Sequence, residues 1–362
     1  MEKINKYFPQ SIPHPGETLA EKLEEMEIGP KEFALRTGKP EKTIIAVLNG
    51  TSAITADMAV QFENATKIPA NYWMNHQQGF DEFMAREKRK PVIQEALVWA
   101  IQFPLAEMIK KGWLPLAKSI EEKTMQMLAF FGFADHNAWE EYYFKQQLKV
   151  AFRISLAHTK EPYAISAWLR KGELQAAELN AGDYDEKRFK EVLPEIKNIM
   201  SKHPKNFFEL LQDLCLQAGV KVVHTPCINK APINGSTRWI KDTPLIQLTG
   251  RYKRNDIFWF TFFHEAGHIL LHGKKDIFLE NIEYSEKDLL KEKEANDFAG
   301  KWTFAEEGYN EISQFYKITV TDILEYAERY NTHPALIIGR LQHEKLLRQT
   351  FGKEFFEPVE FD

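Results

Sequence analysis

Cysteine is nearly absent from this chain of 362 residues. Cys215 and Cys227 are the only two cysteines and form no C-x-x-C pair, so a disulfide framework is not indicated. No apolar run reaches the roughly 18 residues that a membrane-spanning helix needs. The residues after Met1 lead into no apolar segment of a secretion signal. We therefore expect reduced thiols, a cytoplasmic location and no membrane partner.

A strong excess of one charge is lacking as well. The 47 Lys and Arg and the 52 Asp and Glu residues give a formal net charge of −5 at pH 7. Hydrophobic residues make up 44% of the chain and charged residues 27%, which is typical of an ordinary soluble protein. The length allows two or three domains with buried cores, and the sequence contains no internal repeat or low-complexity tract.

The most informative stretch is Phe263–His272, which contains the pattern H-E-x-x-H inside an apolar segment. On a helix, positions i and i+4 lie on one face, so His264 and His268 can bind one metal ion together. Glu265 would lie beside them and act as a general base on water. The apolar residues 257–263 can bury such a helix. We interpret the match as a zinc-site helix rather than a chance pair.

A tetrahedral zinc site needs a further protein ligand, which must come from another segment. Residues 291–300 offer Glu292 and Glu294, and we favour Glu292 because on a helix it shares one face with two alanines. Such small side chains let a helix lie close to a metal-bearing neighbour. Asn296, one turn later, is placed to hydrogen-bond a ligand histidine. The alternative is an exposed, charged helix start with Glu292 in water.

These two segments resemble the ImmA/IrrE family of zinc-dependent peptidases, whose pattern is H-E-x-x-H followed by E-x-x-A-N-x-F-A. The matching residues are 264–268 and 292–299, within a similarity that spans roughly residues 205 to 350. The resemblance implies one zinc ion per chain, held by His264, His268 and Glu292, with Glu265 as the general base. Residues 301–304 read Lys-Trp-Thr-Phe instead of the Leu-Leu-Met-Pro-like stretch of many relatives, which affects the substrate side of the cleft.

Peptide hydrolysis also needs a donor that stabilises the oxyanion. The sequence offers four candidates and places none of them: Tyr252, His272, Arg340 and His343. For His272 the simpler interpretation is a histidine in the last turn of the metal helix, followed by Gly273 as the C-terminal cap.

The N-terminal region has the pattern of five short helices. The predicted helices are residues 16–26, 31–37 and 40–49, a fourth capped by residues 55–57, and a fifth that begins at residue 70. Gly38 ends the second helix and Gly50 the third. A helix, a short turn with glycine and a second helix together form a helix-turn-helix motif.

This region resembles the lambda-repressor-like helix-turn-helix domains, and among them the HigA-type antitoxins. The similarity covers about residues 10–85 and is carried by Pro13–Glu17, Leu48–Gly50, Ile54–Thr55 and Trp73. The resemblance implies that the third helix lies in the major groove and that a homodimer binds a palindromic operator. The residues expected to contact DNA are Lys39, Lys42, Thr43, Thr51 and Ser52.

The charge of this region argues against strong DNA binding. Residues 1–88 hold 10 Lys and Arg against 13 Asp and Glu, a net charge of −3. Because phosphate contacts dominate affinity for DNA, the basic residues would have to be clustered. The third helix also carries Glu41, Ile45 and Ala46 on its exposed face. The alternative is a protein-interaction domain that has the fold without the DNA affinity.

The rest of the chain is predicted to contain a helical middle region and a small sheet. Residues 86–91 are interpreted as a linker, residues 207–218 as a helix, residues 220–223, 240 and 244–249 as strands, and residues 233–239 as a turn with an Asn-Gly signal. We expect an antiparallel sheet, to whose edge a substrate peptide could add beside the zinc.

The predicted fold class is mainly α with a small β-sheet (α+β). It comprises a five-helix helix-turn-helix domain (1–88), a helical middle region whose function the pattern does not indicate (92–203) and a zincin-like metallopeptidase domain (204–362). The leading hypothesis is a DNA-binding regulator with a zinc endopeptidase that cleaves a partner protein, such as a repressor or toxin. The alternative is an antitoxin or repressor that acts only by binding DNA and a toxin, with a structural or sensory zinc site.

Overall fold

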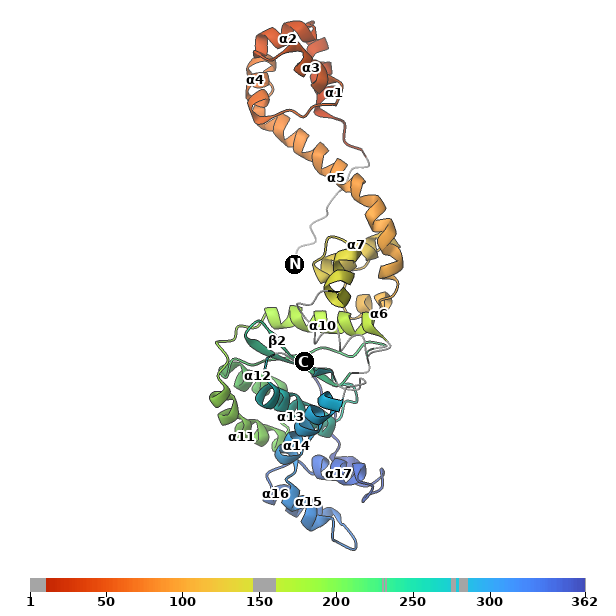
Figure 1. Cartoon of the computed structure of the whole chain (residues 1–362), viewed down its shortest axis with the longest axis vertical. Coiled ribbons are helices and arrows are strands. Elements are labelled where there is room, and N and C mark those ends of the chain that lie inside the picture. Colours follow the sequence, from red (N-terminus) through yellow and green to blue (C-terminus); the bar gives the residue numbers. More distant parts are fainter. Residues whose placement is uncertain are drawn as a thin grey trace. The chain divides into compact units, whose positions relative to one another are not determined.

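Helices make up most of the structure, and one small sheet lies in the C-terminal part (Figure 1). This confirms the predicted fold class. The computed structural model describes residues 11–145, 161–229, 231, 233–274, 278–279 and 286–361. The chain divides into two compact units, Met1–Glu95 and Ala96–Asp362. Within the described ranges, none of the helices combines the length and the apolar character that crossing a membrane requires.

The N-terminal unit contains the predicted helix-turn-helix. Its helices are α1 (Pro15–Glu25), α2 (Pro30–Thr37), α3 (Glu41–Leu48), α4 (Ala56–Thr66) and the first part of α5 (Ala70–Ala100). Gly38, at φ 63°, ends α2 and opens the turn to α3, a conformation that glycine adopts without steric cost. The core between the helices includes Leu19, Phe33, Ile44, Phe62 and Trp73, all fully buried.

The segment before α1 fixes the start of that helix against the end of α3. The His14 Nδ1 atom accepts a hydrogen bond from the Gly16 N–H (2.9 Å), and the Glu17 carboxylate accepts one from the His14 N–H (3.3 Å), as in a capping box. A Cβ on Gly16 would lie 1.9 Å from the carbonyl oxygen of Val47. Glycine is therefore required where α1 meets α3.

The predicted linker at residues 86–91 is wrong, because α5 continues through it to Ala100. Opposite charges three or four residues apart support the helix there: Arg86 pairs with Glu82 (2.5 Å) and Lys90 with Glu87 (2.7 Å). Pro91 removes one backbone donor, but it lies at an exposed position where water can bind the freed carbonyl. The charged run is solvated, as predicted, and helical.

In the described part of the middle region, the regular elements are helices joined by loops. Its elements are α6 (Leu105–Lys110), α7 (Ile120–Phe131), α8 (His136–Glu140), the π-helical turn η1 (Glu141–Lys145), α10 (Pro162–Ala177) and α11 (Glu186–Lys202). The aromatic residues of this region pack ring to ring around the buried Trp139, which stacks on Tyr163 with a centroid separation of 5.4 Å. They form a core, as predicted.

A four-stranded mixed sheet follows. Its strands are β1 (Lys221–His224), β2 (Gly235–Ile240), β3 (Thr243–Leu248) and β4 (Phe278–Leu279), in the order β1-β3-β2-β4. β1 pairs parallel with β3 and the other pairs are antiparallel, so the prediction of a purely antiparallel sheet is wrong. The turn predicted at residues 233–239 is also wrong. Gly235 begins β2, and the hairpin turn is Lys241–Asp242, with Lys241 at φ 57°.

Two helices cover opposite faces of the sheet. Successive residues of a strand point to opposite sides, and in β2 the guanidinium of Arg238 donates to the carbonyl of Leu169 in α10 (2.5 Å), whereas the hydroxyl of Thr237 donates to the carbonyl of Glu265 in α13 (Asn255–His272; 2.9 Å). Because α10 lies in the predicted middle region, that region and the sheet belong to one packed unit.

Helix α13 is the central helix of the C-terminal part. Around it and the sheet pack α12 (Phe207–Gln217), α14 (Glu286–Thr303) and α17 (Pro334–His343), and the remaining elements are α15 (Glu306–Ile312), α16 (Val320–Arg329) and the 3-10 turn η3 (Lys353–Phe355). The side chains of Phe258, Trp259, Phe262 and Phe263 are buried in a common core. This core encloses α13 along most of its length.

Candidate metal centre

The polar residues of α13 lie inside the protein rather than on its surface. His264, Glu265 and His268 are only 2%, 1% and 1% exposed. Buried polar groups are costly unless they have partners. Three buried polar side chains within two turns of one helix therefore indicate a functional site in the interior rather than a chance arrangement of surface residues.

Three side chains of this region converge, His264 and His268 from α13 and Glu292 from α14. The Nε2 atoms of the two histidines are 3.0 Å apart. The Glu292 Oε2 atom lies 3.3 Å from His264 Nε2, and its Oε1 atom lies 3.4 Å from His268 Nε2. Two ligand atoms at roughly 2.0–2.1 Å from one tetrahedral ion are about 3.3 Å apart. These three residues therefore fit the ligand set of a shared zinc ion.

The close approach of α14 to α13 brings Glu292 to the histidines. A Cβ on Gly267 would lie 3.2 Å from the Cβ of Phe298 and 3.3 Å from the Cα of Ala295. Ala295 and Ala299 are fully buried on the facing side of α14. The small residues that the sequence places on one face of this helix therefore do lie against the metal helix.

Each ligand histidine has a hydrogen-bond partner at its second ring nitrogen. The Nδ1 atom of His264 lies 2.9 Å from the Oδ1 atom of Asn296, the position predicted for Asn296. The Nδ1 atom of His268 lies 2.9 Å from the Nδ1 atom of His272. The Nε2 atom of His272 in turn lies 3.0 Å from the Oε2 atom of Glu294. Bonds at Nδ1 leave both Nε2 atoms facing the ion position.

The protonation of the site suits a cation. Burial lowers the pKa of His268 to about 4, although the hydrogen bond with Glu292 acts in the opposite direction. Burial alone would raise the pKa of the Glu292 carboxyl group, but its bonds with His264 and His268 outweigh this and hold the pKa at about 2. At neutral pH His268 is neutral and Glu292 is ionised, and these are the forms that bind metal.

Gly235 is a site residue that the sequence interpretation missed. A Cβ at this position would lie 2.6 Å from Thr261 Cγ2 and 2.7 Å from the Oε1 atom of Glu265. The first residue of β2 thus lies against the carboxylate of Glu265, and only glycine leaves room for it. The sequence predicts a turn at Asn-Gly, whereas in the structure the glycine allows β2 to lie close to α13.

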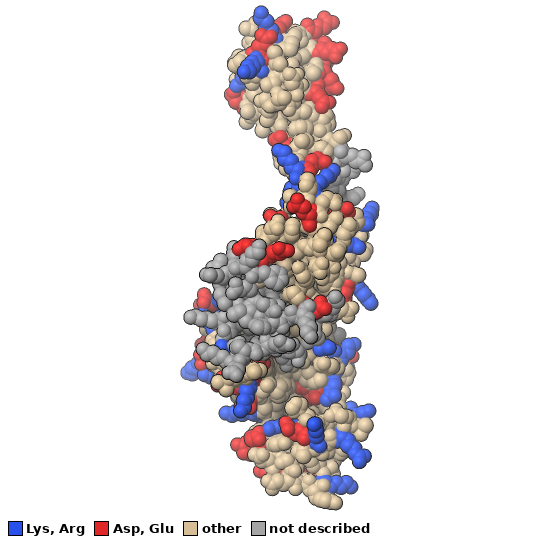
Figure 2. Space-filling model, turned by 45° about the vertical axis from the view of Figure 1, so that its right-hand side comes forward, with Lys and Arg blue, Asp and Glu red and all other residues tan. Residues whose placement is uncertain are grey.

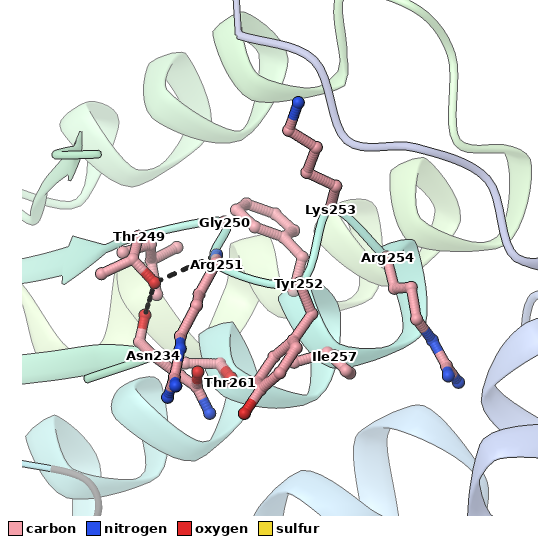
Figure 3. Close-up of a pocket in the computed structure, with 11 residues that line it drawn as sticks. Asn234, Thr249, Gly250, Arg251, Tyr252, Lys253, Arg254, Ile257 and Thr261 are labelled. Atoms are coloured by element: carbon pink, nitrogen blue, oxygen red, sulfur yellow. Dashed lines mark hydrogen bonds between the residues drawn. The ribbon is translucent and has the colours of Figure 1, made fainter. Parts of the chain in front are cut away.

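Tyr252 lies in a pocket between the loop after β3 and the start of α13 (Figure 3). The side chains of Asn234, Arg251, Tyr252 and Thr261 point toward one another there. Thr261 lies one turn before Glu265, so the pocket borders the face of α13 that carries Glu265. Tyr252, which is 51% exposed, is placed beside the site rather than in it.

Two other predicted donors are engaged elsewhere. The side chain of His343 is 85% exposed and contacts Glu344 (3.2 Å). The guanidinium of Arg340 donates to the carbonyl of Phe304 (2.7 Å) and pairs with Glu306. The first residue faces solvent, and the second joins α17 to the segment that begins α15.

The residues predicted to contact DNA lie at both ends of α3. Lys42 and Thr51 are exposed, and Thr43 and Ser52 are partly buried. Lys39 pairs with Asp57 of α4, and the Thr51 hydroxyl donates to the carbonyl of Ala46 (3.0 Å). Figure 2 shows one group of acidic side chains along one edge of the visible face of this unit, while the basic side chains lie apart from that group and have further acidic side chains beside them. The net negative charge is therefore unevenly spread.

The fold and the site define a helix-turn-helix protein with a buried H-E-x-x-H centre. Residues 215–341 match the IrrE N-terminal-like domain of the M78 peptidase family. The N-terminal part is similar to an addiction module antidote protein of the HigA family from Coxiella burnetii. The identity is 32%, covering 23% of this chain and 91% of that chain, with a TM-score of 0.22.

Two further solved structures are similar to the same part. An antidote protein of a plasmid maintenance system from Nostoc punctiforme is 32% identical, covering 24% of this chain and 93% of that chain, with a TM-score of 0.23. The antitoxin HigA of Pseudomonas aeruginosa, solved with the higBA promoter, is 28% identical. The match covers 24% of this chain and 94% of that chain, with a TM-score of 0.23. No curated protein matches the chain.

The N-terminal part of the chain belongs to the HigA antidote family. Membership rests on the 32% identity over nearly the whole length of the Coxiella relative and not on the TM-scores, which are low. This part is joined to the IrrE N-terminal-like domain in one chain.

Proposed function

We propose that this chain is a DNA-binding regulator with a zinc-dependent endopeptidase that cleaves a partner protein, either a repressor or a toxin. The convergence of His264, His268 and Glu292 beside Glu265 carries this proposal. The match to a peptidase family over the same residues supports it. Membership of the N-terminal part in the HigA family supports the regulatory role.

His264, His268 and Glu292 would hold one zinc ion per chain. When bound, zinc supplies a Lewis acid that polarises a carbonyl and lowers the pKa of a water molecule to about 7. Glu265 takes the proton of the attacking water at a carboxylate oxygen and returns it to the amine of the leaving peptide. The burial of Glu265 keeps bulk water from competing for that proton.

The loop after β3 is proposed to border the substrate next to this centre (Figure 3), where the pocket itself, of about 10 Å³, has room for about one water molecule. The polar side chains of the pocket border the face of α13 that carries Glu265, and Tyr252 is the predicted oxyanion donor that lies in it. A phenol hydroxyl can donate to a developing oxyanion. We expect Tyr252→Phe to lower kcat more than it changes KM if Tyr252 has this role.

The helix-turn-helix unit is proposed to bind a palindromic operator as a homodimer and to bring the peptidase to a partner on DNA. The P. aeruginosa relative was solved with its promoter, which supports DNA as the ligand of this fold. Lys42 and Thr43, near the start of α3, are the proposed base-edge contacts. Thr51 and Ser52 are proposed to contact phosphates.

The first experiment is the zinc content of the purified full-length chain, measured beside His264→Ala and Glu292→Ala. About one zinc in the wild type and none in either variant is expected.

The second experiment compares the wild type with Glu265→Gln for the appearance of new N-termini in a peptide library that includes repressor and toxin sequences. Glu265→Gln should keep its zinc and lose cleavage by at least about 10²-fold, whereas the exposed Glu325→Gln should match the wild type. Cleavage by Glu265→Gln would contradict the mechanism.

A second function, antitoxin action by binding alone, is favoured by one observation. The HigA relatives are covered over 91–94% of their own length by only 23–24% of this chain, so they lack a counterpart of the metal centre. Under this alternative Glu265→Gln would behave like the wild type in regulation. Lys42→Ala combined with Thr43→Ala would abolish operator binding and regulation together.

A further inference from the structure

Two polar residues outside the ligand set extend from the metal centre to the surface. His268 contacts His272 through their Nδ1 atoms (2.9 Å), and His272 contacts Glu294 through Nε2 (3.0 Å). The side chain of His272 is 3% exposed and that of Glu294 is 50% exposed. The chain of contacts thus starts at a buried ligand on α13 and ends at a half-exposed carboxylate on α14.

If His268 is neutral and binds a cation through Nε2, the contacts from His268 to His272 and from His272 to Glu294 fix which ring nitrogens carry hydrogen. His268 directs Nε2 at Glu292 and His264, so Nε2 must be free to bind a cation and Nδ1 carries the hydrogen. His268 Nδ1–H therefore donates to His272 Nδ1, which must accept. His272 then carries its hydrogen on Nε2 and donates it to the Glu294 carboxylate, which can only accept.

We propose that His272 and Glu294 are positioning residues that hold His268 in the tautomer and ring orientation that bind zinc. This rests on the proposed zinc site. Glu294 orients His272, and His272 orients His268. Histidine ligands of zinc commonly donate their second N–H to a carboxylate or carbonyl, and loss of that partner typically weakens metal binding 10–100-fold. Here a second histidine stands between the ligand and the carboxylate.

This arrangement removes His272 from the candidates for oxyanion donor. Its Nδ1 atom accepts from His268 and its Nε2 hydrogen is donated to Glu294, so neither nitrogen has a hydrogen left for substrate. The position of His272 as the last residue of α13, followed by Gly273 at φ 73°, was predicted as a helix end. The same placement lets its ring reach α14.

The test is zinc affinity of the full-length chain, measured by competition with a chromogenic chelator. His272→Leu should bind zinc 10–100-fold more weakly than the wild type. His272→Asn should stay within a few-fold, because the Asn Oδ1 atom occupies the place of Nδ1 and accepts from His268. Glu294→Ala should weaken binding in the wild type and have no effect in the His272→Asn background, where no Nε2–H remains to be oriented.

Asp297→Ala is the matched control, since it removes an exposed carboxylate of the same helix. The visible absorption of the cobalt-loaded protein gives a second readout, and its bands should shift in His272→Leu and not in Asp297→Ala. Equal zinc affinity in wild type and His272→Leu would overturn the positioning role while leaving the zinc site intact. A wild type that binds no zinc would overturn the site and the positioning role together.

Discussion

A single missing methyl group shapes the space around the proposed general base. Gly235 lies where a Cβ would come within 2.7 Å of Glu265 Oε1 and 2.6 Å of Thr261 Cγ2. Both neighbours belong to α13, which is packed in the core and cannot move away cheaply. The position of the Glu265 carboxylate therefore depends on a glycine in a different element.

We predict that Gly235→Ala displaces Glu265 and lowers cleavage more than it lowers stability. Overpacking should cost about 1–3 kcal/mol, measured by chemical denaturation, while zinc content stays near the wild-type value. Gly182→Ala is the control, because a Cβ there meets nothing within 4 Å. Unchanged cleavage in Gly235→Ala would show that the Glu265 carboxylate is not held by this contact.

A second residue-scale prediction concerns the dependence of stability on pH. Burial lowers the pKa of His203 to about 4, and the Trp259 Nε1–H donates to its Nδ1 atom (3.0 Å), which therefore carries no proton. The unfolded chain takes up this proton near pH 6.5. Because the folded pKa is the lower one, the contribution of His203 is complete above about pH 6.5 and is lost as the pH falls toward 4.

We expect the Tm of the wild type to fall between pH 6.5 and 4.5 and to fall less steeply in His203→Asn. Asparagine offers an oxygen in place of Nδ1 and tolerates the backbone φ of 39° at this residue. Both proteins are compared after metal chelation, so that zinc release contributes to neither slope. Equal slopes in the two proteins would contradict the assignment to His203.

At the scale of elements, local patterns were predictable and contacts between elements were not. The spacing of His264 and His268 lies within one helix, and caps such as Gly38 mark helix ends locally. The partners of β1 and the packing of α10 on the sheet depend on distant residues. Asn-Gly was ambiguous because a tight turn and a close approach both select glycine.

The same distinction applies to the two glutamates of α14 that the sequence offered as the third ligand. Glu292 and Glu294 are two residues apart and point to different sides of the helix, so the sequence posed them as alternatives. In the structure both glutamates have contacts near the centre: Glu292 lies against His264 and His268, and Glu294 contacts His272. That outcome depends on how α14 lies against α13, which the small residues allow but do not determine.

We predict that widening the contact between α13 and α14 weakens zinc binding. Ala295→Leu adds three carbons at a fully buried position of α14, so the helix and Glu292 must shift outward. Stability should fall by about 1–3 kcal/mol and zinc affinity at least tenfold. Lys301→Leu, at an exposed position of the same helix, should leave zinc affinity unchanged. Wild-type zinc affinity in Ala295→Leu would mean that helix spacing does not set the position of Glu292.

At the scale of the whole molecule, the residues of the two proposed activities lie in separate compact units, so we expect that each activity can be removed separately. The proposed DNA contacts lie in the unit Met1–Glu95 and the metal centre lies in the unit Ala96–Asp362, each with its own core. A substitution in one unit should therefore leave the other folded and competent. The net negative charge of residues 1–88 makes the few basic residues near α3 decisive for DNA affinity.

We predict that Lys42→Ala with Thr43→Ala weakens binding to operator DNA. The slope of the logarithm of the binding constant against the logarithm of the salt concentration should become smaller by about 1, because the charge of Lys42 is lost. Lys88→Ala on α5 removes one exposed charge and should change neither quantity. Glu265→Gln should bind the operator as the wild type does. If both the α3 variant and Glu265→Gln abolish regulation in cells, regulation requires the α3 residues and the Glu265 carboxylate together, as proposed. If only the α3 variant does, regulation proceeds by binding alone and the metal centre serves another purpose.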